Sequence, residues 1–175
     1  MDDTLDAFCA DCRAALKAAA KPADALGQIA EGLARLLTNP EFVAMAFKED
    51  DPPGNRTLHH DAETDFYVLA HVQRPGKRGT PHSHGESWAV YGNARGYTDM
   101  IEWRRVGDAE DGGVVLAPAS KYRLGPGQTR AYGPGVIHST EHPEKAWVIR
   151  ITGTDLDAIP RYRFRPQRDK ILERA

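Results

Sequence analysis

The pattern of apolar residues changes near residue 50, and this change limits the folds open to the chain. Before it, apolar residues recur at spacings of three and four, which places them on one face of a helix. A second helix is expected to start at Pro22, and Asn39-Pro40 indicates the cap and first turn of a short third helix ending near Phe47. The predicted stripes are Leu5, Phe8, Cys9, Cys12 and Leu16 in the first helix, and Ile29, Leu33, Leu36 and Leu37 in the second.

From Phe66 onward, short segments of β-branched and aromatic residues alternate with turn signals, which predicts an antiparallel β-sandwich or barrel. The segments are FYVLAHV, SWAVYGN, GYTDMIEWRRV, GVVLA, TRAYG and AWVIRITGT. The polar stretch 48–62 (KEDDPPGNRTLHHDA) is interpreted as a connector, and RYRFRPQRDKILERA as a strand followed by a loose tail. We expect one structural domain, with a helical section 1–50 packed on a barrel 51–175.

Composition narrows the classes of function. The chain of 175 residues has 23 Lys and Arg against 25 Asp and Glu, a net charge of −2, which argues against a generally basic nucleic-acid binder. No apolar run approaches the roughly 20 residues that a membrane span needs. The start MDDTLDAF is acidic, so no secretory signal is visible, and a soluble cytoplasmic protein is expected, as a monomer or homodimer.

Three of the seven histidines have a spacing that suits a metal site. His82 and His84 in TPHSHGE are two residues apart, so on a strand both would point to one face, about 7 Å apart. His138 follows a Gly-Pro-Gly turn in GPGVIHS, where a neighbouring strand would begin. Imidazoles bind Fe(II), Zn, Ni and Cu, so the pattern predicts one metal held by these three residues. The simpler alternative is surface histidines at strand ends.

HSH, followed by Gly92 and then by Gly135-x-x-His138, resembles the two-part histidine motif of the cupin superfamily. The resemblance implies a mainly β fold, a double-stranded β-helix barrel with a metal inside and an N-terminal helical section. The usual glutamate of the first motif is missing, since the near acid, Glu86, is too close to the histidines.

A three-histidine site without a carboxylate resembles that of the thiol dioxygenases, such as cysteine dioxygenase. These have helices before the barrel and a substrate-binding arginine upstream of the first ligand; at that spacing this chain has Arg56, in NRTL. The resemblance covers roughly residues 56–154. It implies a mononuclear Fe(II) enzyme that takes a small thiol and dioxygen, with Arg56 holding the substrate carboxylate through a bidentate contact.

The chain departs from that family at the position of a crosslinked cysteine and tyrosine. Ala89 stands at the cysteine position, and the tyrosine falls near Thr152. The serine and histidine that orient this tyrosine fall near Val148 and Arg150. The resemblance therefore implies an intact metal site and a small thiol or related carboxylate as substrate, and leaves the identity of the thiol open.

Two other classes of function stay open: a cupin that binds a metal or small molecule without oxygen chemistry, and an isomerase or lyase that uses Zn, Ni or Mn as a Lewis acid.

Glu86 is either an exposed acid or a group near the metal, and His142 is expected in a loop. His59, His60 and His71 have no informative spacing. Cys9 and Cys12 lie on the apolar helix face and are expected only to pack. Most strand aromatics are expected in the core, with one or two lining the pocket: Trp88, Tyr91, Trp103 and Trp147.

Overall fold

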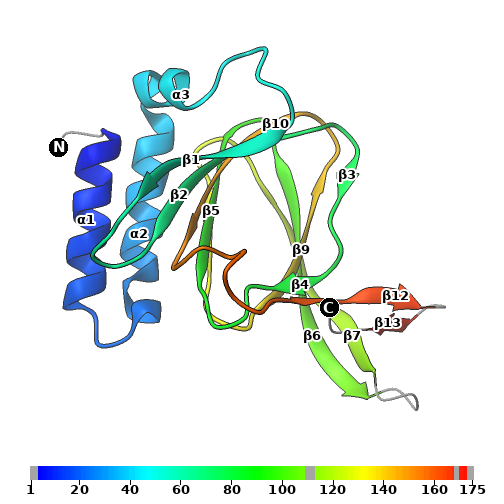
Figure 1. The fold of residues 1–175 in the computed structure, drawn as a ribbon. Coiled ribbons are helices and arrows are strands. Elements are labelled where there is room, and N and C mark those ends of the chain that lie inside the picture. The colour runs from blue at the N-terminus through cyan, green and yellow to red at the C-terminus, as the bar shows by residue number, and fades with distance from the viewer. Residues whose placement is uncertain (1–3, 109–112, 168–169, 173–175) are drawn as a thin grey trace.

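Three helices precede the barrel, as the sequence predicts (Figure 1). The computed structural model describes residues 4–108, 113–167 and 170–172. The Asn39 side chain accepts hydrogen bonds from the backbone of Glu41 and Phe42, which confirms the predicted cap of the third helix. No helix within these ranges is long and apolar enough to cross a membrane. The helices are α1 (Leu5–Ala18), α2 (Pro22–Thr38) and α3 (Pro40–Ala46).

The strands form two facing antiparallel sheets. The first sheet has the order β1 (Gly54–His60), β2 (Tyr67–Gln73), β10 (Ala146–Thr152), β5 (Ala89–Arg95) and β8 (Thr129–Tyr132). The second has the order β11 (Tyr162–Arg163), β4 (His82–Ser83), β9 (Ile137–His142), β6 (Thr98–Asp108) and β7 (Val114–Leu124), with β3 (Lys77–Arg78) also paired to β9. A separate hairpin joins β12 (Arg165–Gln167) and β13 (Lys170–Leu172).

The chain crosses between the two sheets repeatedly from β4 onward. Strands β4, β6, β7 and β9 belong to the second sheet, whereas β5, β8 and β10 belong to the first. This alternation winds the chain into a double-stranded β-helix, so the predicted mainly β barrel with an N-terminal helical section is confirmed.

Three elements differ from the sequence prediction. The segment 48–62 is not only a connector, because its second half forms β1. This strand is mostly exposed and polar at the edge of the first sheet, so it lacks the apolar alternation that marks the inner strands. His82 belongs to a separate two-residue strand, β4, rather than to the start of β5. The predicted C-terminal strand is present as β11, but the predicted loose tail contains the hairpin of β12 and β13. Residues 168–169 and 173–175 of this tail lie outside the described ranges.

The helices cover the outer face of the first sheet (Figure 1). Apolar residues of α2 pack against alternate residues of β5, where Gly92 lies directly under Leu33 and Leu37. A Cβ atom at Gly92 would come within 2.5 Å of Leu37 Cδ1 and 2.9 Å of Leu33 Cδ2. Gly92, the glycine of the histidine motif, therefore allows α2 to pack closely against β5. Cys9 and Cys12 are buried in this same core, and burial raises the pKa of both thiols, which suits their predicted packing role.

We expect Gly92→Ala to lower the free energy of unfolding by about 1–3 kcal/mol, because the added methyl group overpacks the contact between α2 and β5. Gly27→Ala is the matched control, since a Cβ atom at this α2 position meets nothing within 4 Å. It should instead stabilise the protein by about 0.5–1 kcal/mol. Urea unfolding followed by circular dichroism measures both changes; equal effects of the two substitutions would contradict the close-packing account.

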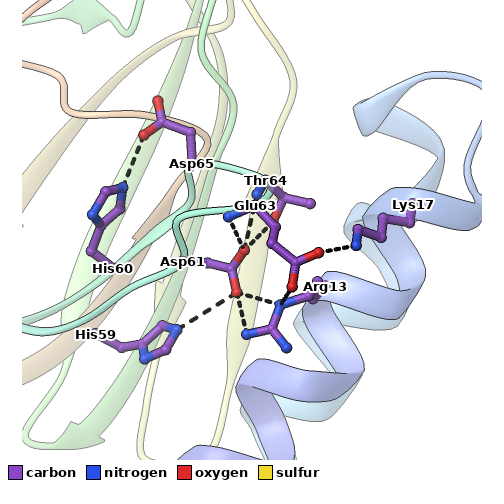
Figure 2. A network of polar contacts seen from close by, with 8 residues as sticks. All are labelled: Arg13, Lys17, His59, His60, Asp61, Glu63, Thr64 and Asp65. Atoms are coloured by element: carbon purple, nitrogen blue, oxygen red, sulfur yellow. Dashed lines mark hydrogen bonds and ion pairs between the residues drawn. The ribbon is translucent and has the colours of Figure 1, made fainter.

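An ion network joins α1 to the turn between β1 and β2 (Figure 2). Asp61 is only 1% exposed and accepts hydrogen bonds from Arg13 Nε at 2.6 Å and from the Thr64 hydroxyl at 2.9 Å. The oxygen that Thr64 binds, Oδ1, also accepts from the backbone N–H groups of Glu63 and Thr64. Burial alone would raise the pKa of Asp61, but these hydrogen bonds together outweigh it and hold the pKa well below its usual value. The carboxylate thus fixes α1 against the hairpin.

Replacing Asp61 with Asn should destabilise the protein by about 1–3 kcal/mol at pH 7, because the buried hydrogen bonds lose their charged acceptor. Since the folded-state pKa of Asp61 lies below the unfolded value of about 3.9, its stabilisation is present above that pH and is lost as the pH falls through the acid range. Denaturant unfolding at several pH values should therefore show the difference between wild type and Asp61→Asn shrinking below about pH 4. The exposed neighbour Glu63→Gln is the control and should change stability little. A pH-independent difference for Asp61→Asn would contradict this assignment.

Candidate metal centre

The three predicted histidines meet at one end of the barrel interior. His82 on β4 is paired in register with His138 on β9, and His84 follows β4 directly. Their nearest ligand nitrogens all lie within 4.8 Å of one another. Among the described residues, this group holds no carboxylate. The cluster could hold a metal ion, as the sequence predicts.

Hydrogen bonds on the far side of two rings leave one nitrogen of each free for a metal. His82 Nδ1 lies 3.0 Å from the Thr80 carbonyl oxygen, and His138 Nδ1 lies 3.3 Å from that of Val136. A carbonyl oxygen only accepts, so both rings carry their proton on Nδ1 and present a bare Nε2. Second-sphere bonds of this kind commonly fix the tautomer of metal-binding histidines.

All three rings are neutral near pH 7. Burial and the neighbouring rings lower the pKa of His84 to about 2. Burial and the proximity of His82 likewise lower the pKa of His138 to about 3, although its bond to the Val136 carbonyl opposes the shift. Burial also lowers the pKa of His82. Because a metal ligand must offer a free lone pair, this environment suits the donor set.

Two tyrosines surround the triad. The Tyr91 hydroxyl lies 3.2 Å from His84 Nε2 and 3.4 Å from His138 Nε2, so it points to the position that a bound ion would face. The Tyr132 ring stacks on His138 with the ring centres 4.3 Å apart and the planes 4° from parallel. The Tyr132 hydroxyl bonds in turn to that of Tyr122 at 2.5 Å, which fixes the stacking ring. The sequence predicts one or two aromatics in the pocket, and Tyr91 is one of them.

His82 and His84 of the triad line a cavity of about 740 Å³ between the two sheets. Its walls carry more positive than negative side chains: Lys77, Arg78, Arg150, Arg161 and Arg163 against Asp155 and Asp157. This excess contrasts with the slightly negative charge of the whole chain. A cavity lined mainly by one sign of charge concentrates ligands of the other sign, so the cavity favours anions.

Arg150 is the cation that lies deepest among these polar groups. It stands on the inner face of β10, in register with Tyr91 on β5 and Leu69 on β2. Burial raises the pKa of Tyr91, and the charge of Arg150 together with a hydrogen bond from it opposes the rise. The Nε atom of Arg150 is buried and has no hydrogen-bond partner among the described residues. This nitrogen of the guanidinium group is therefore left for a ligand beside the triad.

The structure does not bring Arg56 to the histidines. On β1, its neighbours Asn55 and Thr57 line the cavity, whereas the alternating Arg56 side chain points to the opposite face. There Arg56 donates to the carbonyl oxygen of Ala46 in α3 and lies 3.3 Å from Asp51 Oδ2. Arg56 thus binds the end of the helical section rather than the interior.

The structure also shows where the remaining residues of interest lie relative to the triad and the cavity. Glu86 is exposed and lies apart from the metal-binding group. His142, expected in a loop, is instead buried on β9 and lines the cavity, as does His71 on β2. Thr152, at the position of the family tyrosine, also faces the cavity.

Sequence reasoning missed Arg150 as a site residue, although a signal was present. In AWVIRIT a single charged residue interrupts an otherwise apolar strand, between the buried Ile149 and Ile151. Strand alternation places such a charge on the face opposite to its apolar neighbours, which here is the interior of the barrel.

Several solved structures have a fold similar to that of this chain. No protein-family model matches the chain, and no curated protein matches it. A conserved protein of unknown function from Streptococcus pyogenes is 18% identical over 61% of this chain and 77% of that chain, with a TM-score of 0.44. A conserved protein with a double-stranded β-helix domain from Klebsiella pneumoniae is 13% identical over 63% of this chain and 80% of that chain, with a TM-score of 0.45. KdgF from Halomonas sp. is 16% identical over 64% of this chain and 91% of that chain, also with a TM-score of 0.45. The fold assignment rests on the strand order itself.

Replacing His138 with Ala should remove most of the bound metal, because only two imidazoles of the triad remain. His142→Ala is a matched control, since this histidine is also buried on β9 and lines the same cavity but lies outside the triad. It should keep about one metal per chain. Metal content of both purified proteins, measured by inductively coupled plasma mass spectrometry, distinguishes them, and full occupancy in His138→Ala would refute the site.

Proposed function

We propose that the protein is a metal-dependent dioxygenase of the thiol dioxygenase type, which oxidises a small anionic thiol. The observation that carries the proposal is the combination of three neutral imidazoles with an arginine beside them in a cation-lined cavity. A site without a protein carboxylate suits a substrate that brings its own negative charge as a thiolate.

The donor set fits Fe(II), with Zn, Ni or Mn as the alternatives. When bound, Fe(II) would supply open coordination positions and redox chemistry with dioxygen. Tyr91 and Arg150 border the place where the substrate would lie, and two of the three rings, His84 and His138, are buried.

The reaction needs no further reductant. A thiolate and dioxygen give a sulfinate, with both oxygen atoms joined to sulfur, so the sulfur supplies all the electrons that reduce dioxygen. The protein therefore has to bind the substrate, orient its sulfur and admit oxygen. In this proposal Arg150 performs the carboxylate-binding role that the family resemblance implied for Arg56, because Arg150 faces the triad.

Arg150→Ala should leave the metal bound but raise the KM for a thiol carboxylate about ten- to hundredfold, the loss expected for a charge-assisted contact of about 1.5–3 kcal/mol. Arg150→Lys should recover part of this loss, because an ammonium group cannot make the two parallel bonds of a guanidinium. Arg56→Ala is the control and should leave KM unchanged.

Oxygen uptake by the iron-loaded protein, measured with a panel of small thiol carboxylates, gives these constants and tests the function itself. If no thiol supports oxygen uptake above the rate of the His138→Ala protein, the proposed activity is wrong. If the KM of Arg56→Ala rises while that of Arg150→Ala does not, the roles of the two arginines are reversed.

A second candidate is a lyase or isomerase in which the metal acts as a Lewis acid. The position of Tyr91 favours it, because a buried, protonated hydroxyl beside two ligand nitrogens, and close to Arg150, could act as a general acid. Turnover of a carboxylate substrate without oxygen, abolished by Tyr91→Phe, would establish this alternative in place of oxygenation.

A further inference from the structure

The end of the cavity away from the triad contains two buried polar side chains, each with one nitrogen that no described residue pairs. Asn93 on β5 is 0% exposed and His71 on β2 is 8% exposed, and both line the cavity. Asn93 Nδ2 and His71 Nε2 have no hydrogen-bond partner among the described residues. Leaving such a buried group unpaired is destabilising, so a pair of them beside one cavity points to a ligand.

Strand register places these two groups in one row across the first sheet, one on each side of β10. Val148 on β10 is paired with His71 on one side and with Asn93 on the other, so the two residues face the cavity in one row. Arg150 is two residues along β10 on the same face, roughly 7 Å away. The row therefore lies next to Arg150 and one step farther from the triad.

The amide of Asn93 is oriented by hydrogen bonds that cross between the sheets. The Thr98 hydroxyl on β6 donates to Asn93 Oδ1 at 3.0 Å, and Thr98 Oγ1 lies 3.3 Å from His142 Nδ1 on β9. Because the amide oxygen is the acceptor of this bond, the NH₂ group is left to donate into the cavity. The unpaired end of Asn93 is thus fixed as a donor.

The surroundings of His71 are positive. Besides burial, the charges of Arg150 and Lys77 and the proximity of His142 act on this ring, and each of them lowers its pKa. Within the described residues no carboxylate contributes to that shift. An arriving anion would meet the Asn93 donor and positive charge at this end of the cavity.

We propose that Asn93 and His71 form a second anion subsite, which binds a carboxylate distinct from the group held beside the triad by Arg150. The substrate is then a dianion with two acidic groups, one near the metal and one at the far row. This inference rests on the proposed function for the reacting group, but the subsite itself binds a carboxylate whatever the reaction.

The test compares the binding of glutarate and butyrate to the full-length protein by isothermal titration calorimetry, with the metal content of every sample measured and matched. Wild type should bind glutarate at least about tenfold more tightly than butyrate, as expected for an added charge-assisted contact. Asn93→Asp should remove this preference, because it replaces the donor with a repelling carboxylate.

Asn55→Asp is the matched control, since it makes the same charge change on the exposed strand that borders the same cavity, opposite His71. It should weaken glutarate binding much less than Asn93→Asp does. Equal losses in the two variants would show a general charge effect, and equal affinities of wild type for glutarate and butyrate would overturn the subsite.

His71→Leu covers the case in which Asn93→Asp fails to fold. Because the ring nitrogen of His71 has no partner among the described residues, an apolar side chain should raise the melting temperature or leave it unchanged while reducing the preference for glutarate. A variant that keeps the preference overturns the proposal. These binding measurements need neither iron nor oxygen, so failure of the subsite and failure of the dioxygenase proposal are distinguishable.

Discussion

The pairing of β4 with β9 is the contact on which the candidate site depends. Strand β4 contains only His82 and Ser83, yet its register sets His82 directly opposite His138. Strand β9 is held on its other side by β6, and β11 pairs with the free edge of β4 through Tyr162. A shift of one residue would turn His138 to the outside, because side chains alternate along a strand. The candidate metal site is therefore a consequence of strand register.

In the first sheet, the same alternation places packing residues on the face toward the helices and polar residues on the face toward the cavity. On β5, Gly92 faces the helices, whereas Tyr91 and Asn93 face the cavity. On β10, Ile149 is part of the core under the helices, whereas Arg150 faces inward. Packing of the apolar face against α2 thus fixes which polar groups enter the barrel. The helical section contributes no residue to the cavity lining among the described parts of the chain, but it determines how the lining is presented.

The sequence predicted the fold and the triad because both leave strong local patterns. Helical spacing, short β segments and the HSH motif each follow from the period of one element. Arg56 was predicted from a resemblance, and the polar edge strand β1 carries no apolar alternation that could show which way its side chains point. The direction of Arg150 can be predicted, because its apolar neighbours face the helices and strand alternation turns Arg150 toward the interior. The unpaired state of Asn93 could not be predicted, because it depends on contacts between distant strands.

The central claim is that one metal ion lies among the three histidines, and anomalous diffraction tests it most directly. Crystals of the iron-loaded protein, measured on both sides of the metal absorption edge, show where the ion lies. We expect a single anomalous peak between the ring nitrogens of His82, His84 and His138, with no protein carboxylate beside it. A peak at His71 and His142, at the other end of the cavity, or no peak inside the barrel would contradict the account.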